Sequence, residues 1–357
     1  MPDTSPRSAN LRRFGAVAIV VVVALVAAGV AVHRARAGSD LACPLDRHLV
    51  PECGALLGVE PPGPSLANLG RAEASVGRPL DLVYSFHDIN DAAPSAFDRS
   101  VVASGRVLHV DIDSRDYADP DPATVPWAAV ASGAYDENLT RMARGIASLQ
   151  APVFVTFDHE PDQPARSAVG TPAEFVAAWR HVHDLFAEEG ATNAVWVWVV
   201  MALPQTYAAT PAFWPGDRYV DWVSWDSYDE AACRDGGPDP LRFQTFRTAT
   251  LGYLTWLRAQ GGATGIDLDK PMMISETGTV VVPAPGGGFG ATSPSSTWYD
   301  EVPAVLREEP GIKAVTLWDH SGSDPACDFR LDQSAALAAS AARAAADPWF
   351  ADHVRVS

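Results

Sequence analysis

The stretches Thr156–Asp162 (TFDHEPD) and Met272–Gly278 (MMISETG) decide how the rest of this sequence is interpreted. Each opens with apolar or β-branched residues typical of a buried strand, and each apolar run stops at a glutamate, Glu160 or Glu276. Strands that are buried on both faces occur in parallel sheets covered by helices. The two stretches therefore predict an α/β fold in which two glutamates follow two strands.

Six further runs have the same buried character. The eight predicted strands are residues 55–59, 81–86, 106–112, 152–157, 194–200, 220–225, 271–275 and 312–318. Helical segments are expected between them, and the clearest begins with the capping box Thr171-Pro172-Ala173-Glu174 and ends at Gly190. Further helices are expected at 241–260 and 334–346. This alternation predicts a (β/α)8 TIM barrel.

A doubly wound open sheet is the alternative fold. No glycine-rich dinucleotide or phosphate-binding motif follows the first predicted strand, which weakens that alternative.

The N-terminal region predicts export. The uncharged run from Phe14 to Val32 is long enough to span a bilayer, and basic residues flank it on both sides. Ala35-Arg36-Ala37 has the small-x-small form of a signal-peptidase site. We therefore expect a single-pass membrane protein with its main domain outside the cytosol, or a secreted protein if cleavage occurs near Ala37.

The expected domain organisation follows from these patterns. Residues 1–13 form a cytoplasmic segment, 14–32 the anchor or signal core, 33–53 a linker and 54–353 the barrel, which is expected to be a monomer. A net charge of −18 argues against nucleic acid or an anionic lipid surface as a partner of the barrel, because both would repel it. Membrane contact is expected through the N-terminal helix only.

The chain has four cysteines, an even number that suits disulfides outside the cytosol. We expect the pairs Cys43–Cys53 and Cys233–Cys327. A metal site is the alternative, but no C-x-x-C or Cys/His spacing supports one, so no metal and no organic cofactor are expected. Unpaired core thiols are the remaining interpretation.

Polar residues follow the strands at the end where barrels carry their active sites. His87, Asp111, Asp113, His159, Glu160, Asp226, Tyr228, Glu276 and Trp318 are the candidates. A pair of carboxyl groups about 5 Å apart can cleave a glycosidic bond with retention of configuration, one as acid/base and the other as nucleophile. Strand-end carboxylates paired with arginine are the structural alternative. Two tryptophans predicted in loops, Trp214 and Trp298, are expected to contact outer sugars.

The sequence resembles glycoside hydrolase family 26, which contains retaining β-mannanases and related endo-glycanases. The similar segments are FDHEPD, KPMMISETGT, FWPGDRYVDWVSWDSYD and the long helix-to-strand segment from Thr171 to Trp198, within a resemblance that covers roughly 54–350. The resemblance implies that Glu160 is the acid/base and Glu276 the nucleophile. It implies supporting or substrate-binding roles for His159, Tyr228 and Trp318, and we add Asp226 and His87 to the expected substrate-binding residues.

One segment departs from the family. Mannanases usually continue the His-Glu pair with Met-Asn-Gly, whereas this chain has Pro161-Asp162-Gln163-Pro164. The leaving-group side of the site is therefore expected to differ, and mannan is one of several β-glycans expected as substrate, with other β-glucans, xylan and exopolysaccharide. A catalytically silent carbohydrate-binding barrel at the cell surface is the competing functional hypothesis.

Overall fold

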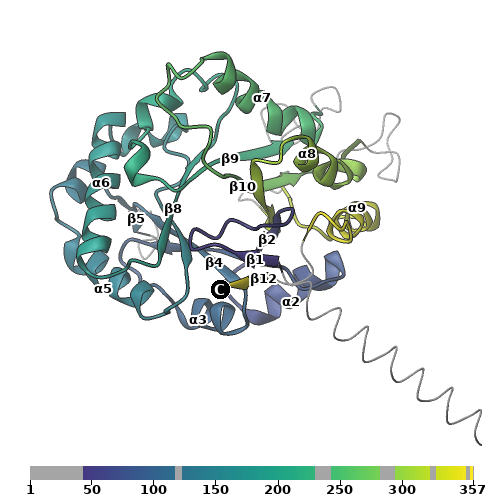
Figure 1. Cartoon of the computed structure of the whole chain (residues 1–357), viewed down its shortest axis with the longest axis horizontal. Helices are drawn as coiled ribbons and strands as arrows, with labels where there is room; N and C mark the ends of the chain where they lie inside the picture. The colour runs from purple at the N-terminus through teal and green to yellow at the C-terminus, as the bar shows by residue number, and fades with distance from the viewer. Residues whose placement is uncertain are drawn as a thin grey trace, which may run out of the picture. The chain divides into compact units, whose positions relative to one another are not determined.

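Eight parallel strands dominate the fold. They are β2 (Leu56–Glu60), β3 (Leu82–Asp88), β4 (Val107–Asp113), β7 (Val153–Phe157), β8 (Ala194–Val200), β9 (Trp222–Asp229), β10 (Met272–Thr279) and β11 (Ile312–Trp318). They close into a barrel in the order β10-β11-β2-β3-β4-β7-β8-β9, seen at the centre of Figure 1. The predicted (β/α)8 barrel is confirmed, and all eight predicted strands are present.

The computed structural model describes residues 43–116, 123–229, 243–281, 294–321, 327–350 and 354–356. Within these ranges no helix has the length and apolar character needed to cross a bilayer. The expected anchor at 14–32 lies outside the described residues.

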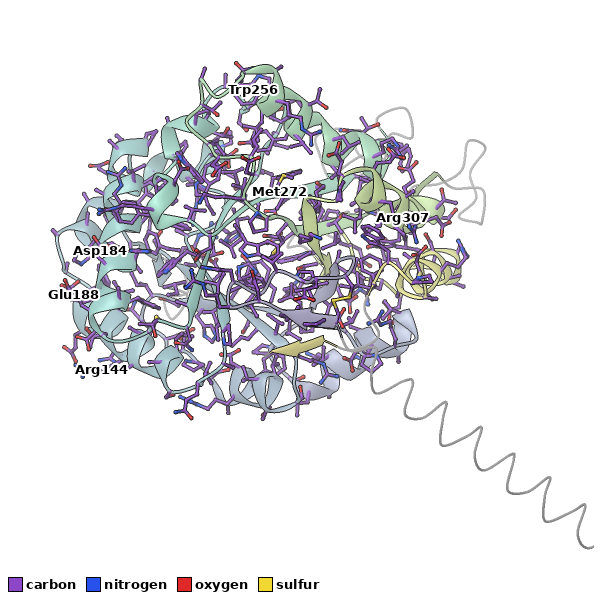
Figure 2. The ribbon with its side chains drawn as sticks, viewed as in Figure 1. Arg144, Asp184, Glu188, Trp256, Met272 and Arg307 are labelled. Atoms are coloured by element: carbon purple, nitrogen blue, oxygen red, sulfur yellow. A yellow bond between two sulfur atoms is a disulfide. The ribbon has the colours of Figure 1, made fainter. Side chains whose placement is uncertain are left out.

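Helices surround the barrel (Figure 1). They are α2 (Leu66–Val76), α3 (Ala96–Ala103), α4 (Trp127–Ala131), α5 (Asp136–Ala147), α6 (Pro172–Glu188), α7 (Phe246–Ala259), α8 (Val302–Glu308) and α9 (Ala335–Ala345). Short 3-10 segments are η1 (Pro164–Ala168), η2 (Thr210–Phe213), η3 (Asp217–Tyr219) and η5 (Pro294–Glu301). The capping box at Thr171 is formed as predicted, and Ser334 caps α9. Figure 2 shows Arg144, Asp184 and Glu188 pointing away from the barrel on α5 and α6.

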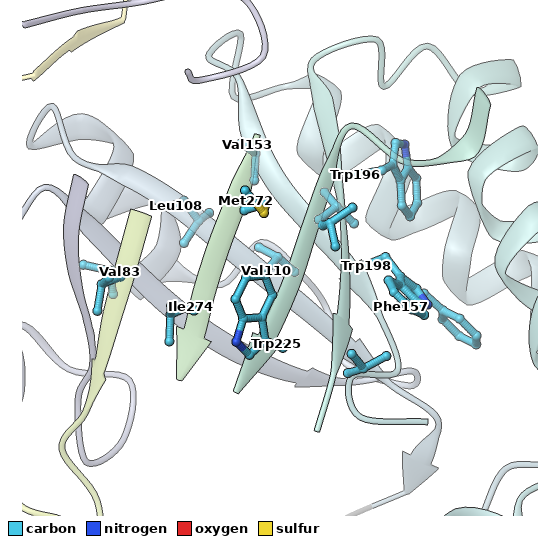
Figure 3. Packing of buried hydrophobic residues seen from close by; sticks show 14 of the residues in the cluster. Val83, Leu108, Val110, Val153, Phe157, Trp196, Trp198, Trp225, Met272 and Ile274 are labelled. Atoms are coloured by element: carbon cyan, nitrogen blue, oxygen red, sulfur yellow. The ribbon is translucent and has the colours of Figure 1, made fainter. Parts of the chain in front are cut away.

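The main hydrophobic core lies between the strands and the helices. Phe157, Trp196 and Trp198 are buried there with the apolar faces of the surrounding helices, and Figure 3 shows them on the helix side of their strands. Successive side chains of a strand point to opposite faces, so the residues between these outward-facing ones fill the barrel interior.

The barrel interior changes from apolar to polar along its axis. At the amino-terminal end of the strands an apolar cluster includes Phe154, Val197 and Trp222. Above it, the ring of Tyr84 stacks on His109 at 3.9 Å, and His109 bonds Thr156 at 2.8 Å. A filled layer therefore lies below the carboxyl ends of the strands, where polar residues including Glu160, Asp226 and Glu276 gather.

Residues 43–53 belong to the barrel and not to a linker. Leu45 and Leu49 join the apolar cluster at the amino-terminal end, and the Trp222 indole N–H donates to His48 O at 2.7 Å. The predicted Cys43–Cys53 disulfide is present. Strand β1 (Cys43–Leu45) pairs in parallel with β12 (Val354–Val356), and a small antiparallel pair joins β5 (Arg115–Asp116) to β6 (Ala123–Thr124).

Cys327 is also disulfide-bonded. Its predicted partner, Cys233, lies outside the described residues.

Strand β10 contains a β-bulge that matters for the site. Between Ile274 and Thr277 the strand advances three positions, while the paired β9 advances two, from Trp225 to Ser227. The extra residue breaks the usual alternation of side chains. Consecutive residues Ser275 and Glu276 both contact side chains of β9, through Ser224 and Tyr228 respectively.

Candidate active site

Three carboxyl groups meet at the mouth of the barrel. One oxygen from each of Glu160, Asp226 and Glu276 lies within 4.8 Å of the others. The three residues are 6%, 6% and 5% exposed. The sequence placed Glu160 and Glu276 at strand ends, and the fold brings them to this common position. These oxygens also lie close enough to share a cation.

Glu276 has one strong hydrogen-bond donor. The Tyr228 hydroxyl donates to Glu276 Oε2 at 2.7 Å, while Oε1 is buried without a hydrogen-bond partner among the described residues. Burial raises the pKa of Glu276 to about 8, and Tyr228 opposes that shift because its bond favours the ionised carboxylate.

Asp226 differs from its two neighbours. Both of its carboxyl oxygens are buried, and no N–H or O–H donor reaches them from the described residues. Burial, followed by the charges of Glu276 and Glu160, raises the pKa of Asp226 well above its usual range. Burial and these two charges therefore favour the protonated form of Asp226, which can share its proton with the adjacent Glu160 carboxyl group.

His159 supplies positive charge beneath the carboxyl groups. Its Nδ1 lies 2.6 Å from Asp111 Oδ2. Burial opposes the charged imidazolium, but the Asp111 carboxylate outweighs it and raises the pKa of His159 to about 10. The protonated His159 imidazolium therefore favours one ionised carboxylate in the pair Glu160 and Glu276.

The backbone around Glu160 is unusual. Asp158 and Glu160 have φ values of 53° and 50°, in the left-handed region that non-glycine residues seldom adopt. The Asp158 carboxylate holds this turn by accepting bonds from Ser114 N at 3.0 Å, Ser114 Oγ at 2.6 Å, the Trp127 indole and Arg166. Such strained turns persist where surrounding contacts fix them, and they are common at functional sites.

The segment that departs from the family pattern contacts the acid/base candidate directly. Gln163 Nε2 donates to Glu160 Oε2. The carboxylate of Asp162 accepts from Met201 N at 2.7 Å and Ala202 N at 3.1 Å, which joins this segment to the loop after β8. The sequence analysis identified this segment as different from that of mannanases but did not predict a role for Asp162 or Gln163.

Trp318 lies at the end of β11, partly exposed. Its ring meets Phe86 edge-on, with ring centroids 5.8 Å apart, and Phe86 meets His159 in the same way at 5.0 Å. This aromatic arrangement places the Trp318 indole beside the carboxyl cluster, where the resemblance expects a platform for a sugar ring.

The structure separates His87 from the cluster. Its Nε2 lies 2.8 Å from Asp98 Oδ2 at the start of α3, and Ser85 Oγ is 3.3 Å away. Alternation explains the correction, because His87 and Ser85 share the outward face of β3 while Phe86 faces the mouth. His87 therefore ties a strand to a helix, and a substrate-binding role is not supported.

Trp214 and Trp298 also differ from expectation. They are 9% and 1% exposed, and Trp298 Nε1 bonds Thr277 Oγ1 at 3.3 Å. Both indoles are core residues and have little surface to offer to a sugar.

Sequence reasoning missed Glu60. It is the last residue of β2, 8% exposed, and burial followed by the charges of Glu276 and Asp319 raises its pKa to about 9. The signal was available, because Leu56–Glu60 is also an apolar run that stops on a glutamate. The predicted strand ended one residue too early to include it.

Comparison with known proteins agrees with this geometry. No model of a known protein family matches the sequence. The chain is 25% identical over 297 residues to Endoglucanase H of Acetivibrio thermocellus, covering 79% of this chain and 29% of that protein. It is 30% identical over 115 residues to β-1,3-xylanase TXYA of a Vibrio species, covering 29% of this chain and 25% of that protein. The chain thus spans less than a third of the length of these curated relatives.

Solved structures with the same fold include glycoside hydrolase family 26 enzymes. A β-mannanase from Bacteroides ovatus superposes with a TM-score of 0.58 at 15% identity, over 84% of this chain and 90% of that one. An endo-β-1,4-mannanase from Cellulomonas fimi gives 0.57 at 18% identity, over 84% and 73%.

The fold is a (β/α)8 barrel with three carboxyl groups at its mouth. More narrowly, the barrel has the same fold as these glycoside hydrolase family 26 structures, in agreement with the resemblance inferred from the sequence.

Proposed function

We propose that this protein is a retaining glycoside hydrolase that cleaves β-glycosidic bonds in a polysaccharide. The observation that carries the proposal is that one carboxyl oxygen of Glu160 lies within 4.8 Å of one carboxyl oxygen of Glu276. Retaining enzymes hold their two carboxyl groups about 5 Å apart, whereas inverting enzymes need roughly 6.5–9.5 Å to admit a water molecule.

The proposed roles follow from the environment of each carboxyl group. Glu276 is the nucleophile, because the Tyr228 hydroxyl stabilises its ionised form. Glu160 is the acid/base, and burial raises its pKa so that it can hold the proton that the departing sugar oxygen needs. Asp226 adjoins Glu160, and its raised pKa favours a protonated carboxyl group that can share its proton with Glu160.

The reaction then has two steps. Glu276 attacks the anomeric carbon while Glu160 protonates the leaving oxygen, which gives a glycosyl ester on Glu276. Glu160, now a carboxylate that accepts the Gln163 N–H, removes a proton from water, and this water cleaves the ester. Configuration is retained because the anomeric carbon is inverted twice.

Substrate and location are proposed at a coarser level. The net charge of −18 favours a neutral or weakly charged β-glycan, and the glycanase relatives support this class. The Cys43–Cys53 disulfide supports action outside the cytosol.

The decisive experiment reads the stereochemistry of the product. The protein is incubated with linear mannan, mixed-linkage β-glucan and xylan, products are separated by chromatography, and the first reducing sugar is followed by proton NMR. We expect oligosaccharides whose new end is the β anomer before mutarotation. An α anomer appearing first would show inversion, and glycan binding in calorimetry without any product would favour the silent binding barrel.

A second test concerns the support of the nucleophile. Tyr228→Phe removes the donor to Glu276 Oε2, so kcat/KM is expected to fall about 10- to 100-fold. Because the lost bond favours ionised Glu276, the pKa of Glu276 rises in the variant, and the acidic limb of the kcat/KM profile moves to higher pH. Tyr135→Phe, on α5's N-cap outside the site, is the matched control. If the acidic limb of the kcat/KM profile is unchanged in Tyr228→Phe, Tyr228 does not control the pKa of the nucleophile.

A further inference from the structure

Gln163 contacts the acid/base candidate twice. Its backbone N–H donates to Glu160 O at 3.1 Å, and its side-chain Nε2 donates to Glu160 Oε2. The first bond closes a four-residue turn shortly after β7, and the second joins the end of that turn to the carboxyl group proposed to react. Glu160 is therefore held by the same residue at its backbone and at its carboxyl oxygen.

The segment EPDQP, residues 160–164, explains this turn. Pro161 stands at the second position of the turn, where its fixed φ angle suits the common turn types. Pro164 restricts the residue before it to an extended backbone, and Gln163 has φ −61° and ψ 135°. The two prolines leave the backbone of Gln163 few conformations, so little entropy is lost when its side chain reaches back to Glu160.

The turn is anchored on both sides of Gln163. The buried carboxylate of Asp162 accepts from two backbone N–H groups of the loop after β8, at 2.7 and 3.1 Å, and from Thr206 Oγ1 at 3.0 Å. On the other side, Arg166 N donates to Gln163 O at 2.9 Å. Because the turn is already fixed, the Gln163 amide does not have to reorganise when Glu160 gains or loses its proton.

The ionisable groups around Glu160 act in opposite directions. Burial raises the pKa of Glu160, and the charge of Asp162 adds to that rise. The imidazolium of His159, a hydrogen bond with Asp226 and the charge of Arg166 lower it. The other ionisable groups that face it from the strands of the barrel are Tyr84 on β3, Tyr228 on β9 and Glu276 on β10. Gln163 differs from all of these groups, because its amide does not titrate and its N–H favours the ionised carboxylate at every pH.

The two steps of the proposed reaction need opposite states of Glu160. In the first step the carboxyl group gives a proton, and in the second it must be ionised to take a proton from water. Burial of Glu160 meets the first requirement and opposes the second. A hydrogen bond to a charged group is roughly twice as strong as one between neutral groups, so the Gln163 N–H favours the state that burial disfavours.

We propose that Gln163 is a positioning residue for the acid/base: its side-chain amide holds the Glu160 carboxyl group and favours the ionised form that acts as a base in the second step. This inference rests on the proposed hydrolase function and deepens it. In that step water gives its proton to Glu160 while its oxygen bonds the anomeric carbon. The bond between this carbon and Glu276 breaks, and Glu276 leaves as a carboxylate. The Gln163 amide keeps its own protons throughout.

The test isolates the second step with a leaving group that needs no proton. The full chain is assayed on the 2,4-dinitrophenyl β-glycoside of mannobiose or cellobiose, whichever the unchanged protein hydrolyses faster. Gln163→Met keeps the length of the side chain and removes the donor, so the pKa of Glu160 rises. We expect the acidic limb of the kcat profile to move to higher pH by about 0.5–1 unit. Below that limb kcat falls about three- to tenfold, while kcat/KM stays within about twofold, so KM falls with kcat.

Two further variants frame this result. Gln260→Met is the matched control, because Gln260 is also partly exposed and donates its side-chain amide to Trp256 O at 3.2 Å, at the C-cap of α7 outside the site. It should leave both the limb and kcat unchanged. Gln163→Glu replaces the donor with a negative charge beside Glu160, and it is expected to move the limb further to higher pH than Gln163→Met does. Circular dichroism confirms that each variant is folded.

Each outcome has a separate meaning. If the acidic limb of kcat does not move in Gln163→Met, the amide does not act on the ionised acid/base and the inference is wrong. If kcat and kcat/KM fall by the same factor without a shift of the limb, Gln163 only shapes the turn, which also overturns the inference. Failure of the unchanged protein to hydrolyse any glycoside would instead overturn the proposed function.

Discussion

Glu276→Ala is expected to lower kcat on an activated aryl β-glycoside by about four orders of magnitude. In the proposed mechanism the substitution removes the group that forms the glycosyl ester, and the remaining contacts of Tyr228, His159 and Glu160 cannot replace that bond. The measurement is release of 4-nitrophenol under saturating substrate, with protein folding checked by circular dichroism.

Azide makes this experiment specific. In Glu276→Ala the cleared space admits a small anion, which attacks the anomeric carbon directly, and we expect restored turnover with an α-glycosyl azide as product. Glu137→Ala is the matched control, because this glutamate pairs with Arg141 on the exposed face of α5. Full activity of Glu276→Ala without azide would remove Glu276 from the chemistry.

Arg166→Met is expected to lower the free energy of unfolding by about 3–5 kcal/mol. The guanidinium group is 3% exposed and bonds both Asp113 Oδ1, at 2.9 Å, and Asp158 Oδ1. Its removal leaves the buried Asp158 carboxyl group without its arginine and takes from Asp113 the nearer of two arginines, since Arg115 Nε lies 3.6 Å from Asp113 Oδ2. That cost exceeds the loss of the bonds alone. Urea unfolding followed by tryptophan fluorescence measures the change.

Two further variants assign this loss to the buried charges. Arg144→Met removes a surface arginine that pairs with Glu189 at 2.7 Å, and it is expected to cost less than about 1 kcal/mol. Adding Asp158→Asn to Arg166→Met removes the buried charge that has lost its arginine and should recover part of the stability. A double variant no more stable than Arg166→Met would point to packing and not charge.

The strands could be predicted because their burial leaves a direct trace in the sequence. Runs such as Ala194–Val200 (AVWVWVV) are apolar on both faces, as a strand between a packed barrel interior and a helix layer must be. Their carboxyl ends were less accurate. β3, β9 and β10 run past the predicted ends into polar residues, since the backbone ladder continues where side chains begin to line the mouth.

The site was predicted in part for the same reason. Glu160, Asp226 and Glu276 follow apolar runs, and the closed barrel brings them together. The facing direction of a rim residue depends on register, which the sequence pattern does not reveal at a polar strand end. His87 therefore joined the expected list although it points to α3, and the contact of Gln163 with Glu160 depends on a left-handed turn that no periodicity signals.

The bulge in β10 makes the direction of the Glu276 side chain depend on the number of residues between Ile274 and Thr277. Because Ser275 and Glu276 together oppose a single position of β9, the glutamate faces the mouth only while the strand keeps its extra residue. Substitutions along this strand alter packing, but the loss or gain of one residue would exchange which side chain faces the substrate. A chain that lost this residue would keep the barrel but would no longer direct Glu276 to the mouth, and under the proposed mechanism it would lose its nucleophile.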